Sequence, residues 1–346
     1  MIVDTPEEAA ELEVNPLLVL RPIEAMLDNA GLGAGPTRAE RLGDGHSNIT
    51  FLLTRGDERF VLRRPPRPPL PPSAHDVLRE ARMLRTLASS GARVPAVYFE
   101  HEGGAPLGVP FYVMEFVDGV VIADELPASL DTLADRRRIG EELVDALVEL
   151  HSLEPAAIGR PTGYLDRQLR RFSGLWEHSR TRELATIDEV TRRLMTRVPT
   201  SAASTYVHGD YRLGNTVFAR DTPARLATIL DWELATVGDP LADVGYLTAT
   251  WVEPGYSPGP LALSPVTAGE GFLGRGALAE RYEQGSGRPL TDLAWYRALA
   301  LWKAAIFLEG NYRRWREGQS DDPYYEAMDE GVPVLAELAL QELARA

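Results

Sequence analysis

The residues best suited to catalysis lie in two short segments, HGDYRLGNTVF at positions 208–218 and ATILDWE at positions 227–233. The first contains Asp210 and, five positions later, Asn215; in the second, an apolar run leads into Asp231. A carboxylate that accepts or orients a hydroxyl proton, with an amide oxygen and a second carboxylate, fits a metal–phosphate site. Hard oxygen ligands of this kind favour magnesium, whose remaining ligands are phosphate oxygens and water. The two segments therefore predict phosphate chemistry.

Each of these residues also has a purely structural explanation. Asp and Asn favour turns and helix caps, so any one of them taken alone indicates little. Their joint spacing, with β-like runs on either side, favours one shared site over unrelated turns. For His208 we expect a structural role, in which its ring hydrogen-bonds the loop backbone. Asp239, which precedes Pro240, is expected to cap a helix.

The elements that must position these residues change character along the chain. Between residues 39 and 117, short β-rich runs predict the order strand, strand, strand, helix, strand, strand, and thus a five-stranded antiparallel sheet with one helix. Beyond Gly119 helical patterns dominate, including one over 130–153 and a continuous one over 164–198. We expect an α+β protein in three parts: an N-terminal helical extension (1–34), a sheet lobe (35–118) and a larger helical lobe (119–346).

A His-x-Asp loop with Asn five positions later, followed by a strand that leads into Asp, resembles the catalytic and metal loops of the protein-kinase-like superfamily. The glycine after His208, and Trp-Glu after Asp231, are similar instead to the aminoglycoside phosphotransferase and choline kinase branch. Within that branch, FVLRRPP, PSAHDVLREARML, VMEFVDG and LDWELATVGDPLADVGY most resemble the kinase-like domain fused to certain acyl-CoA dehydrogenases and its free-standing bacterial relatives. The resemblance covers about residues 35–340, in matching order.

The resemblance implies a bilobal protein-kinase-like fold and transfer of a phosphoryl group from ATP, with Mg, to a hydroxyl of a small molecule. Asp210 would be the catalytic carboxylate, and Asn215 and Asp231 the magnesium ligands. Asp243 would accept hydrogen bonds from the backbone of the 208–212 loop. A nucleotide and a small-molecule acceptor are therefore the expected ligands.

The segment LGDGHSNIT, residues 42–50, joins the first two predicted strands. Gly43 and Gly45 permit close approach of the backbone to phosphates, and Ser47 could add a hydroxyl donor. Taken alone, the segment fits a polar hairpin turn equally well. The resemblance favours the phosphate role, because the family has its nucleotide flap here.

The third predicted strand should carry a lysine that binds the α- and β-phosphates and pairs with a glutamate of the following helix. In this chain Arg63 occupies that position, Arg64 faces the other side, and Glu80 is the natural partner. The alternative is a surface Arg–Glu pair of little energetic weight. The resemblance also implies a hinge in which the Glu115 carbonyl and the Val117 N–H bind the adenine edge.

Composition excludes several classes of function. The chain has no cysteine, which excludes disulfides and thiolate metal sites, and its net charge of −15 argues against a general nucleic-acid binder. No run approaches the ~20 apolar residues that span a bilayer, and the N-terminus lacks the pattern of a signal peptide. We expect a cytoplasmic protein without nucleic-acid or membrane partners; the oligomeric state stays open. Of 36 basic residues only Lys303 is a lysine, so a phosphate site must rely on arginine, backbone N–H groups and metal.

The acceptor site is expected in the helical lobe. The candidate contacts are aromatic, amide and arginine side chains of its predicted helices: Gln168, Arg170, Arg171, Trp176, Arg180, Trp251, Trp302, Tyr312, Arg313 and Trp315. Aromatic residues at helical spacing more often form a core, whereas the arginines favour an anionic acceptor. The relatives imply a hydroxylated acyl compound, as a hydroxy acid or a hydroxyacyl-CoA. Two alternatives stay open: an aminoglycoside antibiotic phosphotransferase, and a nucleotide-binding pseudokinase with a regulatory role, which Arg63 in the lysine position would favour.

Overall fold

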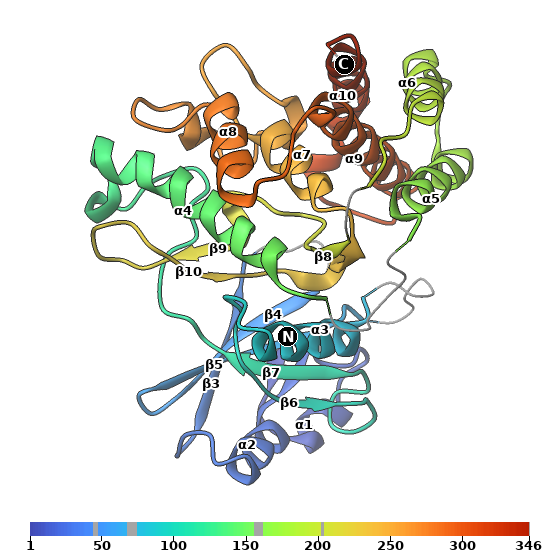
Figure 1. The fold of residues 1–346 in the computed structure, drawn as a ribbon. Coiled ribbons are helices and arrows are strands. Elements are labelled where there is room, and N and C mark those ends of the chain that lie inside the picture. Colours follow the sequence, from blue (N-terminus) through green and yellow to red (C-terminus); the bar gives the residue numbers. More distant parts are fainter. Residues whose placement is uncertain (44–47, 68–74, 156–161, 202–203, 346) are drawn as a thin grey trace. The chain divides into compact units, whose positions relative to one another are not determined.

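The computed structural model of the chain describes residues 1–43, 48–67, 75–155, 162–201 and 204–345 (Figure 1). The chain forms two compact units. Unit 1 comprises Met1–Asp118 and Thr228–Glu233, and unit 2 comprises Gly119–Ala227 and Leu234–Ala346. Residues 1–34, which we expected as a separate extension, thus belong to unit 1, and so does the short segment that carries Asp231.

Unit 1 is built on a five-stranded antiparallel sheet, as the sequence predicted. Its strand order is β3-β4-β5-β7-β6 (Figure 1). The strands are β3 (Thr37–Leu42), β4 (Ile49–Arg55), β5 (Glu58–Arg64), β6 (Val97–His101) and β7 (Phe111–Glu115). Gly56, with φ 58°, occupies the tight turn between β4 and β5, where a left-handed backbone favours glycine. Arg63 and Arg64 are consecutive residues of β5, and because side chains alternate along a strand they face opposite sides of the sheet.

The N-terminal segment covers part of this sheet. It contains β1 (Ile2–Val3), α1 (Pro6–Ala10), β2 (Leu18–Val19) and α2 (Leu20–Asn29). Ile23 and Leu27 of α2 are fully buried in a core with strand residues such as Phe51. Helix α2 of this predicted helical extension begins only at Leu20, because Leu18 and Val19 before it pair in parallel with β1.

Helix α3 (Val77–Ser89) is the single helix predicted between the strands. It begins where the side chain of Asp76 accepts the Arg79 N–H at 2.9 Å, an N-cap interaction that satisfies one of the first orphan donors. Its buried residues include Glu80, a carboxylate, beside the apolar Ala81 and Leu84. A buried carboxylate requires a partner, and this places a polar site beneath α3.

Unit 2 is mainly helical (Figure 1). Its helices of ten or more residues are α4 (Leu133–Ser152), α5 (Tyr164–Ser179), α6 (Ala185–Thr196), α7 (Leu241–Thr250), α8 (Arg275–Ser286), α9 (Leu293–Arg316) and α10 (Met328–Leu343). Helix α9 packs against α5, α6, α7 and α10, and its residues Trp302 and Ile306 are fully buried in the core. The apolar residues of α9 surround the helix, as expected of a buried helix.

The prediction of one continuous helix over residues 164–198 is wrong. The structure has two helices, because α5 ends where Thr181 is captured by Glu309 of α9. Glu309 is fully buried, and its Oε1 accepts the backbone N–H of Thr181 at 2.9 Å and the hydroxyl at 2.7 Å. This contact links residues far apart in sequence, so the local helical pattern could not reveal it.

Short strand pairs carry the loops of chemical interest. In unit 2, β8 (Thr205–Val207) pairs with β11 (Thr236–Gly238). Strand β9 (Thr216–Phe218) pairs with β10 (Leu226–Ile229). The segment between β8 and β9 contains Asp210 and Asn215, and Asp231 follows β10.

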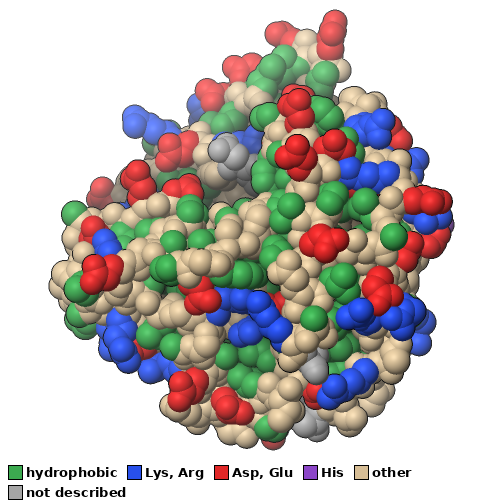
Figure 2. All heavy atoms as spheres, turned by 90° about the horizontal axis from the view of Figure 1, so that it is seen from above, with side chains coloured by type: hydrophobic (Ala, Val, Ile, Leu, Met, Phe, Trp, Pro, Cys, Tyr) green, Lys and Arg blue, Asp and Glu red, His purple; other side chains and the backbone are tan. Residues whose placement is uncertain are grey.

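Acidic and basic side chains are interspersed over the face of the molecule shown in Figure 2. Many surface arginines of unit 2 have a carboxylate close by on the same helix, as in the pairs Arg137–Glu141 and Arg193–Glu189. Such exposed pairs contribute little stability. No helix among the described residues is long and apolar enough to cross a membrane.

Candidate active site

Asp210 lies in a loop of unit 2 between β8 and a 3-10 turn formed by Leu213–Asn215. The amide nitrogen of Asn215 donates to the Asp210 carboxylate at 2.8 Å and to its backbone carbonyl at 2.9 Å. The five-residue spacing thus places the two side chains in direct contact. Because both bonds use the amide nitrogen, the amide oxygen of Asn215 is the atom left to bind a cation.

A buried aspartate holds the loop in shape. Asp243, at the start of α7, accepts the backbone N–H groups of His208 at 2.7 Å and Gly209 at 2.8 Å. His151 lies 3.2 Å from the same carboxylate. Burial acts to raise the pKa of Asp243, but the His151 hydrogen bond, nearby histidines and the backbone donor outweigh it, so this pKa is lowered. Asp243 therefore stays ionised, and the predicted backbone contact is confirmed.

Two further residues fix the loop backbone. The ring Nδ1 of His208 accepts the Asp210 N–H at 3.2 Å, the structural role expected for this histidine. Gly209 has φ 89°, and a Cβ atom there would lie 3.0 Å from the Cβ of Leu234. A larger residue would meet both strain and a clash, so glycine is required after His208.

The sequence did not single out three unit 2 residues near the Asp210 carboxylate. Arg212 Nε lies 3.7 Å from Asp210 Oδ2. Burial and then the charge of Asp210 raise the pKa of the Tyr246 hydroxyl well above its ordinary value. Lys303 on α9 is also close enough to Asp210 for their charges to interact. Arg212 lies two positions from Asp210 in the same loop, whereas the approach of Tyr246 and Lys303 depends on how α7 and α9 pack and leaves no signal in the chain order.

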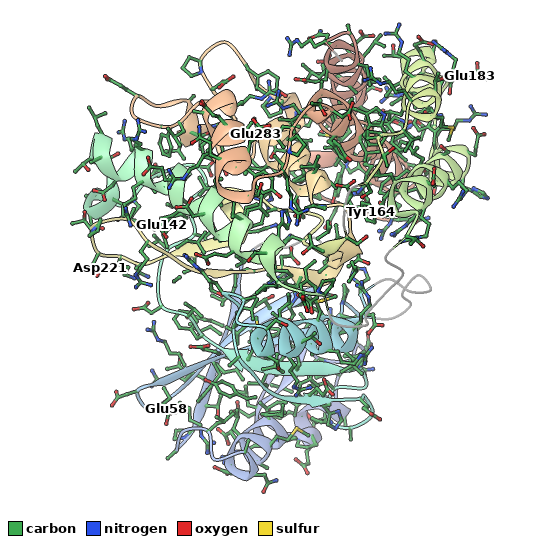
Figure 3. The ribbon with its side chains drawn as sticks, in the orientation of Figure 1. Glu58, Glu142, Tyr164, Glu183, Asp221 and Glu283 are labelled. Atoms are coloured by element: carbon green, nitrogen blue, oxygen red, sulfur yellow. The ribbon has the colours of Figure 1, made fainter. Side chains whose placement is uncertain are left out.

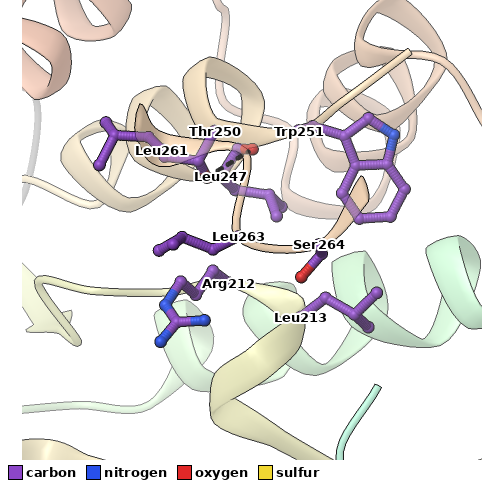
Figure 4. Close-up of a pocket in the computed structure, with 8 residues that line it drawn as sticks. All are labelled: Arg212, Leu213, Leu247, Thr250, Trp251, Leu261, Leu263 and Ser264. Carbon is purple, nitrogen blue, oxygen red and sulfur yellow. Dashed lines mark hydrogen bonds between the residues drawn. The ribbon is translucent and has the colours of Figure 1, made fainter. Parts of the chain in front are cut away.

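A small cavity lies beside the catalytic loop in unit 2 (Figure 4). It is lined by Arg212, Leu213, Leu247, Thr250, Trp251, Leu261, Leu263 and Ser264. Its volume of about 10 Å³ is room for a water molecule rather than for a substrate. The cavity therefore does not mark the acceptor site.

Unit 1 contains a separate cluster of charges around Arg63. The guanidinium donates to Glu80 Oε2 at 3.0 Å and to Asp231 Oδ1 at 2.7 Å. Glu233 Oε2 lies 3.7 Å away. Burial acts to lower the pKa of Arg63, but the charges of Glu80, Asp231 and Glu233 raise it overall. The predicted Arg63–Glu80 pair is present, and Asp231 joins it.

This cluster has more negative than positive charge. Glu80 is almost fully buried; burial raises its pKa to about 7, although Arg63 acts to lower it and Asp231 and Glu233 act to raise it. Tyr112, the cross-strand partner of Arg63, is also buried. Three carboxylates lie around Arg63, and the guanidinium of Arg79 donates to the Glu233 carbonyl at 2.9 Å. A further cation would stabilise this carboxylate-rich region.

Asp231 has an unusual backbone conformation, with φ 62°. Positive φ is uncommon for residues other than glycine, although Asp and Asn tolerate it better than most. The adjacent Trp232 is buried, and its indole donates to the Ile229 carbonyl at 2.9 Å. This hydrogen bond fixes the end of β10 and with it the aspartate. A strained backbone at a charged residue is a common feature of functional sites.

The other predicted nucleotide residues also lie in unit 1. Gly43, with φ 66°, follows β3; Gly45 and Ser47 lie outside the described residues. Glu115 ends β7, and its N–H donates to the Ala96 carbonyl at 2.8 Å. Val117 lies two residues further on, and within the described part of the chain its N–H has no hydrogen-bond partner. That N–H is suited to a ligand acceptor.

Of the predicted acceptor contacts, Gln168 and Trp315 are partly buried, and the others fall into two groups, aromatic residues and arginines. Trp176, Trp251, Trp302 and Tyr312 are buried, so the core explanation holds for these four aromatic residues. Arg170 and Arg171 are exposed on α5. Arg180 and Arg313 line a cavity of about 420 Å³ with Thr181, Arg316 and Glu317, near the end of α9.

Comparison with known proteins identifies the family. A model described as "Phosphotransferase enzyme family" matches residues 38–299. Acyl-CoA dehydrogenase family member 11 of Rattus norvegicus is 30% identical over 99% of this chain and 45% of its own length. Acyl-CoA dehydrogenase family member 10 of Mus musculus is 29% identical over 88% of this chain and 29% of its own length. The chain thus spans less than half the length of these relatives.

A solved structure from Ralstonia eutropha JMP134, assigned to the aminoglycoside phosphotransferases, superposes with a TM-score of 0.79. It is 29% identical in sequence, and the match covers 94% of this chain and 98% of that one. The predicted resemblance and kinase-like fold are therefore confirmed. The chain belongs to the phosphotransferase enzyme family.

Proposed function

We propose that the protein transfers the γ-phosphoryl group of ATP, with Mg, to a hydroxyl of an anionic small molecule, either a hydroxy acid or a hydroxyacyl-CoA. The observation that carries the phosphotransfer is the Asp210 carboxylate, held by the Asn215 amide on a loop that buried Asp243 fixes. In this role Asp210 orients the acceptor hydroxyl and accepts its proton as the new P–O bond forms, while the bond between the γ-phosphorus and the β–γ bridging oxygen breaks and ADP leaves.

The residues present fit a magnesium site completed by phosphate. Within the described residues no three Asp, Glu or His side chains form a metal-binding group. Magnesium bound to ATP does not need such a cage, because phosphate oxygens and water supply most of its ligands. Asp231 and the amide oxygen of Asn215 are the proposed protein ligands. When bound, the metal would neutralise phosphate charge.

Arg63 is the proposed contact to the α- and β-phosphates. It retains its positive charge, and Glu80 and Asp231 orient its planar guanidinium through two hydrogen bonds. The Val117 N–H and the Glu115 carbonyl are the proposed adenine contacts. Gly43, with Gly45 and Ser47 of the undescribed segment, would cover the phosphates. An Arg63 that is already oriented by carboxylates favours an active enzyme over a pseudokinase.

Two observations support an anionic acceptor. Arg170 and Arg171 are exposed on α5, and neither forms an ion pair with a described residue. The relatives named above are acyl-CoA dehydrogenase family members, whose names point to acyl compounds. Phosphotransferases that act on polycationic antibiotics need carboxylates in this region instead. The aminoglycoside alternative rests on the structural relative.

The decisive experiment is a substrate panel read by mass spectrometry. It contains straight-chain hydroxyhexanoates with the hydroxyl at each position, their CoA thioesters, and kanamycin. We expect a phosphorylated product, formed only with ATP and Mg, from at least one acid or thioester. Phosphorylation of kanamycin alone would establish the aminoglycoside alternative.

A further inference from the structure

Lys303 is the only lysine among 36 basic residues, and it lies in the middle of α9. Its neighbours on the helix, Leu301 and Trp302, are fully buried, whereas Lys303 itself is partly exposed. Among the described residues it has neither an ion pair nor a hydrogen-bond partner. Keeping an ammonium group charged costs free energy when little water surrounds it and it has no ion-pair or hydrogen-bond partner. An anionic group of a bound ligand would lower that cost.

The surroundings of Lys303 form a small cationic group next to the catalytic loop. Its Nζ lies 5.0 Å from the ring centre of Phe172, and the guanidinium carbon of Arg171 lies 5.8 Å from the same centre. The charged groups that act on Lys303 are Asp243 of α7, Asp210 of the catalytic loop and Arg171 of α5. Cations and the Asp210 carboxylate are thus close together in unit 2.

Neither aspartate uses Lys303 as a partner. Asp243 is already satisfied by the His208 and Gly209 N–H groups and by His151. Asp210 is held by Asn215. The lysine is therefore not needed to neutralise either carboxylate, and the printed contact that could support a structural role is the cation–π contact with Phe172.

The two helices that carry these cations are fixed to the catalytic scaffold. Tyr164, at the start of α5 (Figure 3), packs so closely on Gly238 of β11 that a Cβ there would lie 2.5 Å from the tyrosine ring. Strand β11 pairs with β8, which leads into the Asp210 loop. Helix α9 packs directly on α7, which carries Asp243. The cations are consequently held in place relative to Asp210.

We propose that Lys303, assisted by Arg171, binds the anionic group of the acceptor while the acceptor hydroxyl faces Asp210, which makes Lys303 a specificity-determining residue. This inference rests on the proposed function and names the residue that recognises the substrate charge. A compact ammonium pairs with one carboxylate or phosphate oxygen without demanding planar geometry. Burial lowers the pKa of Lys303 to about 8, against the opposing effects of Asp243 and Asp210. Its charge is therefore sensitive to mildly alkaline pH.

The test compares Lys303→Met with the wild type on hydroxyhexanoates and on the matching hexanediols, which lack the charge. We expect KM for the acid to rise by about 10- to 100-fold, the effect of losing a hydrogen bond between charged groups, with KM for ATP and for the diols unchanged. In the wild type, KM for the acid should rise as pH increases through about 8, because the free ammonium loses its proton there. The variant should lack this dependence, and Lys303→Arg should recover part of the affinity without it.

Arg314→Met is the matched control, because it removes an exposed cation from the same helix. It lies roughly three turns beyond Lys303, so KM for the acid should not change. Thermal unfolding gives a second readout. Because its pKa is lowered in the folded protein, Lys303 destabilises the fold fully below about pH 8, and this cost disappears above its ordinary value of 10.5. Lys303→Met should therefore be more stable than the wild type at pH 7, whereas loss of a structural residue would destabilise the protein.

The inference and the proposed function fail in different ways. Phosphorylation of hydroxyhexanoates with an unchanged KM in Lys303→Met would overturn the inference and leave the proposed function intact. If no acid or thioester is phosphorylated, the proposed function fails, and calorimetric binding of hexanoate tests the anion site without catalysis. Hexanoate binding that is lost in Lys303→Met supports the site, and binding that is equal in both proteins overturns it.

Discussion

The two units hold their functional residues by different means. In unit 1, Arg63 is positioned by side-chain charges, namely Glu80, Asp231 and Glu233. In unit 2, the Asp210 loop is positioned mainly through its backbone, whose N–H groups bind Asp243. The Arg63 cluster of unit 1 contains more carboxylates than Arg63 alone can neutralise. In unit 2, by contrast, the Asp243 carboxylate already accepts the hydrogen bonds that hold the loop.

Because of this difference, substitutions in the two units should affect different measurable quantities. A charge cluster with excess carboxylates responds to cations and to each substitution of a charged side chain, so changes there should appear in nucleotide and magnesium affinity. A loop fixed by buried backbone hydrogen bonds is preorganised, so changing the side chain that it presents should appear in turnover. The following predictions test that division, from the largest expected effect to the smallest.

Asp210→Ala should have the largest effect. We expect turnover to fall by about 10²–10⁴-fold, as for loss of a general base, with little change in ATP affinity. The loop should keep its shape, because Asp243 binds its backbone. Steady-state kinetics combined with nucleotide titration checks this. Near-normal turnover in the variant would remove Asp210 from the mechanism.

Arg63→Ala should raise KM for ATP and lower turnover together, each by about tenfold or more, because a charge-assisted contact to phosphate is lost. Arg63→Lys should be impaired as well, since an ammonium cannot bridge Glu80 and Asp231 as the planar guanidinium does. Kinetics at several ATP concentrations measures both effects.

Arg64→Ala is the matched comparison on the next residue of β5. Arg64 is buried on the opposite side of the strand, where it donates to the carbonyls of Pro65 and Leu17. Its loss should lower the free energy of unfolding by about 1–3 kcal/mol, through unsatisfied carbonyls, and leave KM for ATP unchanged. If Arg64→Ala folds well but binds ATP poorly, the nucleotide contact lies on the side of the sheet that Arg64 faces, and not on the side that Arg63 faces.

The sequence predicted the elements with local patterns, and it missed what depends on distant contacts. The strands follow from alternation and turn residues, so the five-stranded sheet of unit 1 could be predicted. The pair Arg63–Glu80 followed from the resemblance and from the helix after β5. The break between α5 and α6 depends on Thr181 meeting Glu309, which no local pattern shows.

The same limit applies to the candidate sites. Asp210 and Asn215 are close in sequence, so their contact could be anticipated. Lys303 approaches Asp210 only through the packing of α9, and in the sequence it is distinguished only as the single lysine. Glu233 was visible beside Asp231, but its place near Arg63 depends on the conformation of that segment.

Asp231→Asn should weaken magnesium-dependent nucleotide binding by about tenfold, with partial recovery at high magnesium, because a charged oxygen ligand is replaced by a neutral one. Asparagine tolerates positive φ, so the backbone at this position should not be disturbed. Calorimetry with Mg–ATP measures the effect independently of turnover.

Glu233→Gln serves as the control for Asp231→Asn. It removes one charge from the same cluster, but its carboxylate lies farther from Arg63, at 3.7 Å, and is not a proposed metal ligand. We expect a smaller loss of Mg–ATP affinity in this variant. Equal losses would show that total charge, rather than ligation by Asp231, determines the affinity.

Glu115→Ala should have the smallest effect, because the proposed adenine contact is the backbone carbonyl and not the side chain. Among the described residues the carboxylate accepts only the Ala96 N–H, at 3.2 Å and exposed to solvent, so its loss should alter ATP affinity by less than about twofold. Val117→Pro removes the N–H proposed to bind adenine and should weaken ATP binding by about fivefold or more. Nucleotide titration of both variants, with GTP beside ATP, measures the contrast. The contrary outcome is a large loss of ATP affinity in Glu115→Ala with no loss in Val117→Pro. It would mean that the adenine contact depends on side-chain charge, as the position of Arg63 does. Positioning through the backbone would then be confined to the Asp210 loop of unit 2.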